Sequence, residues 1–120
     1  MKWRALALCV VWLHAAAADL SEARAYRYGN GVTVDKVKAA RLFEQAAVQG
    51  DADAAFTLAN MLRDGEGVPQ DAAAAARWLQ RAADGESPEA LQQQAMEESD
   101  PARAAQLFKE AAHALTHQRR

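Results

Sequence analysis

The sequence is poor in the residues that build disulfides, metal centres and thiol-based sites. It contains one cysteine, Cys9, and three histidines. A single cysteine excludes an internal disulfide, and Cys9 lies in an N-terminal segment that we expect to be removed. Proline and glycine are also scarce, with three and six residues in the 120-residue chain. Few residues therefore interrupt regular secondary structure.

Neither sign of charge is in strong excess. The chain has 14 basic and 16 acidic residues, and two of the basic ones, Lys2 and Arg4, lie at the N-terminal end. A nucleic-acid interface needs clustered Lys and Arg facing phosphates, so this balance argues against a nucleic-acid partner. A hydrophobic content of 51% with 25% charged residues is ordinary for one globular domain.

The one sustained apolar run lies near the start of the chain. Lys2 and Arg4 precede the apolar run 5–13, and Ala16 to Ala18 precede Asp19. These are the three zones of a secretory signal peptide, which we assign to residues 1–18. The run is too short for a stable membrane anchor. The sequence therefore predicts cleavage after Ala18 and a periplasmic or secreted protein of the bacterial envelope.

Two alternatives to a cleaved leader remain open. Residues 1–18 could form an amphipathic first helix of the fold. Cys9 could instead carry a lipid, although Leu8 stands where lipidation requires a small residue.

The chain contains a repeated unit. Gly29-Asn30-Gly31-Val32 recurs as Gly65-Glu66-Gly67-Val68 at an offset of 36 residues. The ten residues 38–47 have counterparts at 74–83 and 103–112. A period in the thirties is typical of an α-solenoid, in which each helix pair buries its apolar face against the next pair.

Each central unit is predicted to be two amphipathic helices joined by a Gly-rich turn. Glycines suit the end of the first helix, and Asp71 suits the N-cap of the second. We expect Leu58, Trp78 and Phe108 to point into a shared interior. The apolar stripes at helical spacing are Ala55, Leu58, Ala59 and Leu62, then Ala75, Trp78, Leu79, Ala82 and Ala83.

The third unit departs from the pattern. Ser87 and Pro88 begin its first helix, in which Gln94 and Glu98 replace Leu58 and Leu62. The Gly-x-Gly-Val turn is missing, and the offset falls from 36 to 29, so this joint is seven residues shorter. The last helix is predicted to close the array as a cap, through the stripe Ala104, Leu107, Phe108, Ala111, Ala112 and Leu115.

These repeated residues resemble the Sel-one-like repeat (SLR), a relative of the tetratricopeptide repeat. The resemblance is carried by the Gly-x-Gly-Val turn, the following Asp and the closing Ala-Ala pair. It implies an all-α fold, a short right-handed α-solenoid of antiparallel helix pairs. We expect a single domain over 19–120, with units near 20–50 and 54–85 and a degenerate third unit and capping helix over 87–117.

Residue patterns for catalysis, cofactor binding or metal binding are weak. The Gly29-x-Gly31 motif lacks the third glycine of a dinucleotide loop. His113 and His117 are one helical turn apart, but we interpret them as complementing the helix dipole. The carboxylate pairs Asp51/Asp53 and Glu97/Glu98 lie at helix starts or turns, where we expect ordinary pKa values. We therefore predict no catalytic, cofactor or metal site and no enzymatic activity.

The resemblance implies a helical scaffold that holds an unknown protein or peptide. Recurring polar positions on the second helices are our candidate binding surface, although they would equally suit a solvated face. Unit edges that lack a neighbour provide further candidates, including the helix of Gln92 to Gln94. The candidate residues for partner binding are Arg41, Gln45, Arg77, Arg81, Gln106, Tyr26 and Tyr28.

Three functions remain open from the sequence. The first is an adaptor that binds a protein or peptide. The second is a structural element that self-associates through the edge 20–28. The third, implied only by cysteine-rich secreted relatives of this repeat, is an enzyme acting on cell-wall-type ligands or β-lactams. A chain without cysteines beyond Cys9 lacks the disulfides of those relatives.

Overall fold

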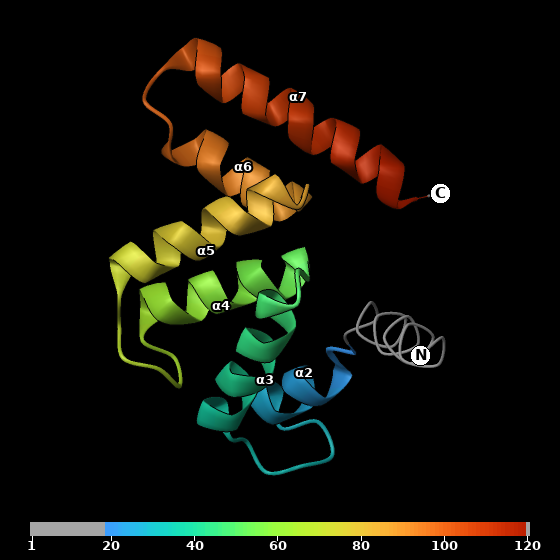
Figure 1. The fold of residues 1–120 in the computed structure, drawn as a ribbon, viewed down its shortest axis with the longest axis vertical. Helices are drawn as coiled ribbons and strands as arrows, with labels where there is room; N and C mark the ends of the chain where they lie inside the picture. Colours follow the sequence, from blue (N-terminus) through green and yellow to red (C-terminus); the bar gives the residue numbers. More distant parts are fainter. Residues whose placement is uncertain (1–18, 120) are drawn as a thin grey trace, which may run out of the picture.

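The computed structural model describes residues 19–119, and the predicted leader at residues 1–18 lies outside them. The described residues are helical and contain no strand (Figure 1). None of these helices is both long and apolar enough to cross a bilayer. The helices are α2 (Ser21–Tyr28), α3 (Lys36–Val48), α4 (Ala52–Asp64), α5 (Ala72–Asp84), α6 (Pro88–Glu97) and α7 (Pro101–Gln118).

Five of the six described helices begin with a side-chain cap, and two of these caps, Asp71 and Ser87, were predicted. An N-cap side chain accepts a hydrogen bond from a backbone N–H of the first turn, which would otherwise have no partner. Gly65 ends α4 with a φ of 70°, as the turn prediction required. The side-chain caps are Asp35 on α3, Asp51 on α4, Asp71 on α5, Ser87 on α6 and Asp100 on α7.

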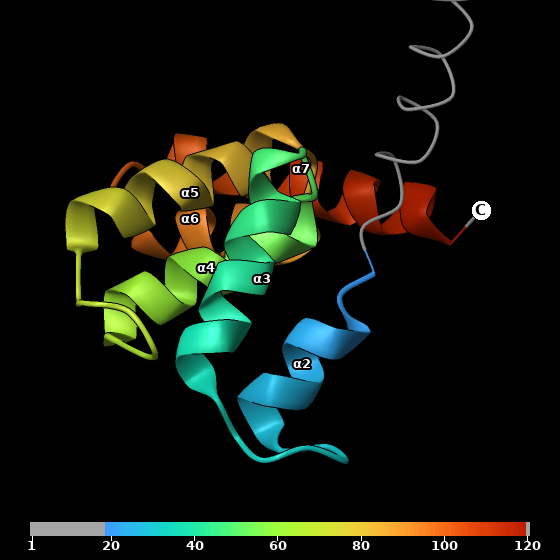
Figure 2. The same ribbon diagram turned by 60° about the horizontal axis from the view of Figure 1, so that its bottom comes forward.

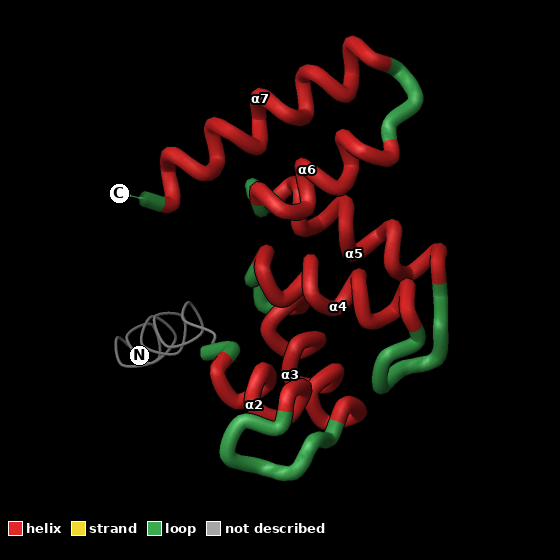
Figure 3. Tube along the Cα trace, turned by 180° about the vertical axis from the view of Figure 1, so that it is seen from behind, coloured by secondary structure: helices red, strands yellow, loops and turns green. Residues whose placement is uncertain are grey.

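The helices form three hairpins that stack in chain order. Helices α2 and α3 form the first hairpin, α4 and α5 the second, and α6 and α7 the third. Helix α4 packs on α3, and α6 packs less extensively on α5. Figure 2 shows α2 and α3 of the first hairpin side by side, and Figure 3 shows the loops that join the helices. The predicted short α-solenoid is confirmed.

Alanine dominates the interior of this stack. Phe43 and Met61 are the largest side chains in it and are 1% and 0% exposed. The remaining volume is filled because small side chains let helix backbones approach closely. The buried alanines are Ala23, Ala39, Ala40, Ala46, Ala47, Ala54, Ala55, Ala59, Ala75, Ala82, Ala83, Ala90, Ala95, Ala111 and Ala114.

The second hairpin packs on the first through the turn between α4 and α5, which lies on the start of α3. A Cβ added at Gly67 would overlap the backbone carbonyl of Lys36, so only glycine permits this approach. Beside it, the Arg27 guanidinium reaches the Glu66 carboxylate through Nε–Oε1 and Nη2–Oε2 contacts of 3.1 and 2.9 Å. This fork joins α2 to the turn between α4 and α5 across 39 residues of sequence.

The predicted interior needs correction at Phe108 and in part at Trp78. Leu58 is buried as predicted, Trp78 is half-buried, and Phe108 is 48% exposed. The counterparts of Phe108 in the earlier units are Phe43 and Leu79, which lie on helices covered by α4 and α6. Among residues 19–119, no helix follows α7 to cover the corresponding face.

The same absence of a covering helix changes the apolar stripe of α7. Ala112 and Leu115, predicted to be inside, are exposed along with Phe108. The buried face consists of Leu107, Ala111 and Ala114. Helix α7 therefore packs through a narrower face than predicted. Its outer face carries apolar side chains, whereas the outer face of a terminal capping helix is usually polar.

The two equivalent glycines Gly31 and Gly67 provide a matched test of the hairpin junction. Both have left-handed φ values, 77° and 71°, but a Cβ at Gly31 would meet no atom within 4 Å. We expect Gly31→Ala to cost about 1 kcal/mol of unfolding free energy from backbone strain alone. Gly67→Ala should cost about 1–3 kcal/mol more, because the turn must move away from Lys36. Thermal denaturation followed by circular dichroism measures both; equal losses would contradict this account of the junction.

The Arg27–Glu66 pair predicts a pH-dependent contribution to stability. The hydrogen bond from Arg27 holds the pKa of Glu66 below its ordinary value of 4.5. The folded state therefore binds fewer protons than the unfolded state, and the stabilisation is complete above that value and is lost as pH falls through the lowered pKa. We expect Glu66→Gln to lower the unfolding free energy by about 1 kcal/mol at pH 7.

Denaturant unfolding at pH 7 and at pH 3 checks this effect, because the difference between Glu66→Gln and wild type should shrink at the lower pH. The control is Glu44→Gln on the exposed side of α3, which should change stability little at either pH. A difference for Glu66→Gln that stays constant with pH would show that the carboxylate charge is not involved.

Candidate functional site

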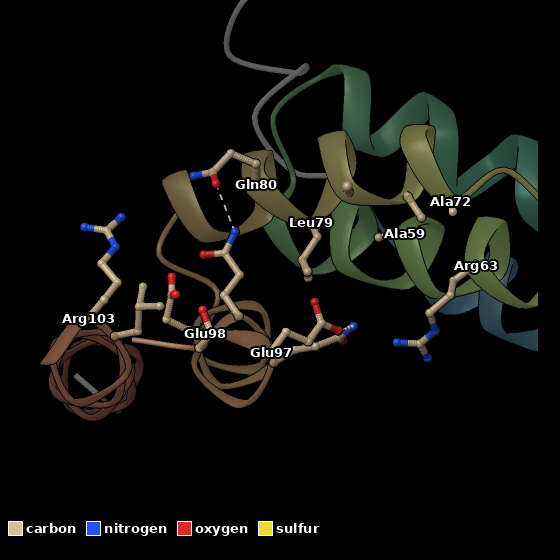
Figure 4. Close-up of a pocket in the computed structure, with 14 residues that line it drawn as sticks. Ala59, Arg63, Ala72, Leu79, Gln80, Glu97, Glu98 and Arg103 are labelled. Carbon is tan, nitrogen blue, oxygen red and sulfur yellow. Dashed lines mark hydrogen bonds between the residues drawn. The ribbon is translucent and has the colours of Figure 1, made fainter. Parts of the chain in front are cut away.

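A groove of about 480 Å³ lies between the second and third hairpins. We call it the inter-hairpin groove; Figure 4 shows it in close-up. Its floor is apolar and its rim carries amides and charges. It is lined by Ala59 and Arg63 of α4, Ala72, Ala75, Ala76, Leu79 and Gln80 of α5, Gln93, Gln94 and Glu97 of α6, Glu98 and Ser99 of the following joint, and Arg103 and Leu107 of α7.

The groove exists because α6 lacks part of the apolar stripe. Gln94 occupies the position that Leu58 has one unit earlier, where Leu58 is buried. The Gln94 side chain instead donates a hydrogen bond to Oε1 of Gln80 on α5 at 3.0 Å (Figure 4). An exposed amide pair holds two helices further apart than interlocked leucines do, so the space beside it remains open.

The joint between α6 and α7 borders the same groove. It consists of three residues, 98–100, whereas the turn between α4 and α5 consists of the seven residues 65–71. The Glu98 carboxylate accepts a hydrogen bond from the backbone N–H of Asp100 at 3.1 Å, which closes the short joint. The shorter joint leaves the groove without a turn equivalent to the one between α4 and α5, which packs on the start of α3.

The groove contains both signs of charge. Figure 4 shows Arg63 and Arg103 at opposite ends of the view with Glu97 and Glu98 between them. The Glu97 carboxylate accepts a hydrogen bond from Gln93 at 3.0 Å, so both acidic side chains have donors from their own surroundings. Among residues 19–119, the ion pair of Arg63 is with its neighbour Asp64 at 3.3 Å, and that pair is largely exposed.

The residues predicted for partner binding lie on several parts of the surface. Arg41 and Gln45 line shallow hollows along α3. Arg77 is exposed on α5 outside the groove, and the Arg81 guanidinium stacks 4.8 Å above the Trp78 ring. Gln106 donates a hydrogen bond to Glu110 at 3.0 Å and lines a separate hollow beside α7. The structure does not bring these five residues together, and their role in binding stays a prediction.

The predicted edge residues divide between exposed and packed positions. Tyr28 is 61% exposed beside Arg27, whereas Tyr26 is half-buried and its hydroxyl accepts a hydrogen bond from Lys38 at 3.0 Å. Of the glutamine cluster, Gln93 and Gln94 line the inter-hairpin groove. The second of the two candidate surfaces from the sequence therefore contributes directly to this site.

Sequence reasoning missed the two arginines of the groove. Arg63 and Arg103 are isolated charges on helix surfaces when each helix is considered alone. One signal was available: Arg63 is the counterpart of Arg27 at the 36-residue offset. A second signal was the short third joint, because it indicated that the surroundings of Arg63 would differ from those of Arg27.

The histidine pair on α7 forms a local contact. The Nε2 atoms of His113 and His117 lie 2.9 Å apart, and their rings meet edge to face. Within the described part of the chain, no three His, Cys, Asp or Glu side chains cluster as metal ligands would.

The expectation of ordinary carboxylate pKa values is wrong at Asp53. Surrounding protein atoms desolvate this side chain and raise its pKa, and the charges of Glu89 and Asp51 raise it further. The smaller, electrostatic part of the rise comes from Glu89 in the first turn of α6 and from Asp51, the N-cap of α4. It lies outside the inter-hairpin groove, which does not include Asp53.

Stacked helical hairpins with a groove between them define an α-solenoid repeat scaffold, a class that fits protein interaction. The Sel1 repeat pattern matches residues 14–51, 52–87 and 90–114. The chain therefore belongs to the Sel1 repeat family, and the first match begins within the predicted leader. A comparison with curated proteins gave no match.

Two solved structures are similar to this fold. One is a Sel1 repeat protein from Oxalobacter formigenes, with a TM-score of 0.75 and 25% identity over 79% of this chain. Another is c5321, a protective antigen present in uropathogenic Escherichia coli strains that displays an SLR fold, with a TM-score of 0.70 and 25% identity over 78% of this chain. The matched region spans 42% and 22% of those two longer chains.

Proposed function

We propose that this chain is an exported, non-enzymatic scaffold that binds a segment of a partner protein in the inter-hairpin groove. The observation that carries the proposal is the groove itself, which combines an apolar floor around Leu79 and Leu107 with amide and charged groups at its rim. Peptide recognition uses this combination, because apolar contacts provide affinity and a few polar groups fix orientation.

The groove suits an extended segment better than a small substrate. It is partly open to solvent and is lined by four helices and the joint between α6 and α7. Its polar groups are amides, guanidinium groups, carboxylates and the Ser99 hydroxyl, and among the described residues no hydrogen bond joins that hydroxyl to a base. Such groups hold a ligand by hydrogen bonds and charge, which supports binding over catalysis.

Export rests on the N-terminal segment. Lys2 and Arg4, the apolar run 5–13 and the small residues before Asp19 support a leader that directs the protein to the bacterial envelope. In that compartment the mature chain would be a periplasmic or secreted scaffold with a protein or peptide partner.

Filling the groove should abolish partner binding without disturbing the fold. Ala76 is exposed and lines the groove, so Ala76→Trp places a large side chain in it. The measurement is photo-cross-linking in the native envelope from a photoreactive residue at position 93. We expect the yield of cross-linked partner to fall about tenfold or more in this variant. Thermal stability should stay within about 0.5 kcal/mol of wild type, because Ala76 is not part of the core.

The matched control is Ala73→Trp, because Ala73 is exposed on the same helix but does not line the groove. It should retain the cross-linked partner. Equal loss or equal retention in both variants would contradict binding in the groove.

Processing of the leader gives a separate prediction. We expect the protein isolated from the periplasm or medium to begin at Asp19, as measured by N-terminal sequencing. Replacing Ala18 by a bulky residue should shift or block cleavage, because signal peptidase sites require small residues there. An intact N-terminus on protein retained in the cytoplasm would contradict export.

A further inference from the structure

The first hairpin junction shows how this repeat engages an arginine at the end of a first helix. At that junction, Arg27 of α2 holds the Glu66 carboxylate in a two-atom fork, and each of the two side chains is 19% exposed. The adjacent residue Gly67 rests against the backbone of Lys36 at the start of α3. The recognised element is thus a turn in which a glutamate is flanked by glycines.

The next junction retains the arginine of this arrangement but lacks the turn, and it also lacks the lysine, because Lys36, which lies 3.6 Å from the Glu66 carboxylate, is replaced by Ala72. At the 36-residue offset, Arg63 is the counterpart of Arg27, and Ala72 is the counterpart of Lys36. Both Arg63 and Ala72 line the inter-hairpin groove. The seven residues expected to be missing from this joint are divided in the structure: α6 is three residues shorter than α4, and the joint 98–100 is four residues shorter than the turn 65–71. This end of the groove therefore lies where a Gly-Glu-Gly-Val turn lies one unit earlier.

The Arg63 guanidinium is the group at this end of the groove that can bind a carboxylate. Arg63 is partnered at its Nε by Asp64 in a pair whose side chains are 48% and 57% exposed. An exposed pair of this kind contributes little, and the guanidinium has further donors for a second, forked carboxylate. Glu97 and Glu98 also line the groove, but their carboxylates accept hydrogen bonds from Gln93 and from the Asp100 backbone.

We propose that the Arg63 end of the groove binds a glutamate presented on a glycine-flanked turn of a partner protein, in the way that Arg27 binds Glu66 within this chain. The partner turn completes the junction that the shortened third unit leaves incomplete. Arg63 takes the carboxylate, and the small side chain of Ala72 leaves room for the glycine backbone to approach the start of α5. This inference rests on the proposed binding function and names the chemistry of the partner segment.

The chain itself provides a probe for this proposal. A blocked hexapeptide with the sequence of residues 65–70 contains the turn, and the Glu66 position is its one carboxylate. Titrated into the isotope-labelled chain, it should bind with a Kd on the order of 1 mM and shift amide resonances at the end of α4 and the start of α5. Replacing its glutamate by glutamine should weaken binding about tenfold, because a charge-assisted fork is lost.

Variants of the protein isolate the role of Arg63. Arg63→Ala should weaken binding of the glutamate peptide about tenfold and leave binding of the glutamine peptide unchanged, because the two changes remove the same contact. Lys109→Ala removes an exposed basic residue of α7 that does not line the groove, and this variant should bind both peptides as wild type does. Circular dichroism should give the same melting temperature for all three proteins.

Several results would overturn the proposal. The first is that the glutamate peptide binds wild type and Arg63→Ala equally. The second is that wild type binds the two peptides equally. The third is that amide resonances do not shift at peptide concentrations up to about 10 mM. Self-association that depends on Arg63, seen by sedimentation at two protein concentrations, would replace the partner with a second copy of this chain. If Ala76→Trp abolishes cross-linking while Arg63→Ala does not, the groove binds a partner and the carboxylate assignment alone fails.

Discussion

The contact between the Gly67 turn and the first turn of α3 is the constraint on which the stacking of the first two hairpins depends. Glycine is required there because any side chain would overlap the Lys36 carbonyl. The Arg27–Glu66 fork beside it is largely shielded from water, so it fixes the orientation of one hairpin on the next. Together they set the spacing at which small alanines can fill the interior.

The third hairpin is attached without this contact, and its surroundings differ accordingly. An amide pair between Gln80 and Gln94 takes the place of leucine packing, and the short joint supplies no turn to meet Arg63. Open space and an arginine whose ion pair is with its own helix therefore occur together at one junction. The groove arises from an interruption of the repeat, because a regular junction would fill the same space with its own turn.

Much of the fold was predictable because its determinants are local or periodic. Asp71 and Ser87 cap their helices as predicted, and Leu58 is buried on the predicted stripe. Phe108 was misassigned because its pattern is identical to that of Phe43, while burial depends on whether another helix covers the face. The candidate site was harder to predict, since Arg63 and Arg103 approach one space only when two hairpins stack.

The sequence by itself determined the helices, their caps, the repeat and the loss of one turn, because hydrogen-bonding and hydrophobic periodicity act over a few residues. Only the tertiary structure decided which apolar faces are covered and where the lost turn leaves a groove. It also decided which arginine is paired across hairpins and which faces the groove. These properties depend on atoms far apart in the chain: Arg27 pairs with Glu66 of the next hairpin, whereas Arg63 pairs with Asp64 of its own helix.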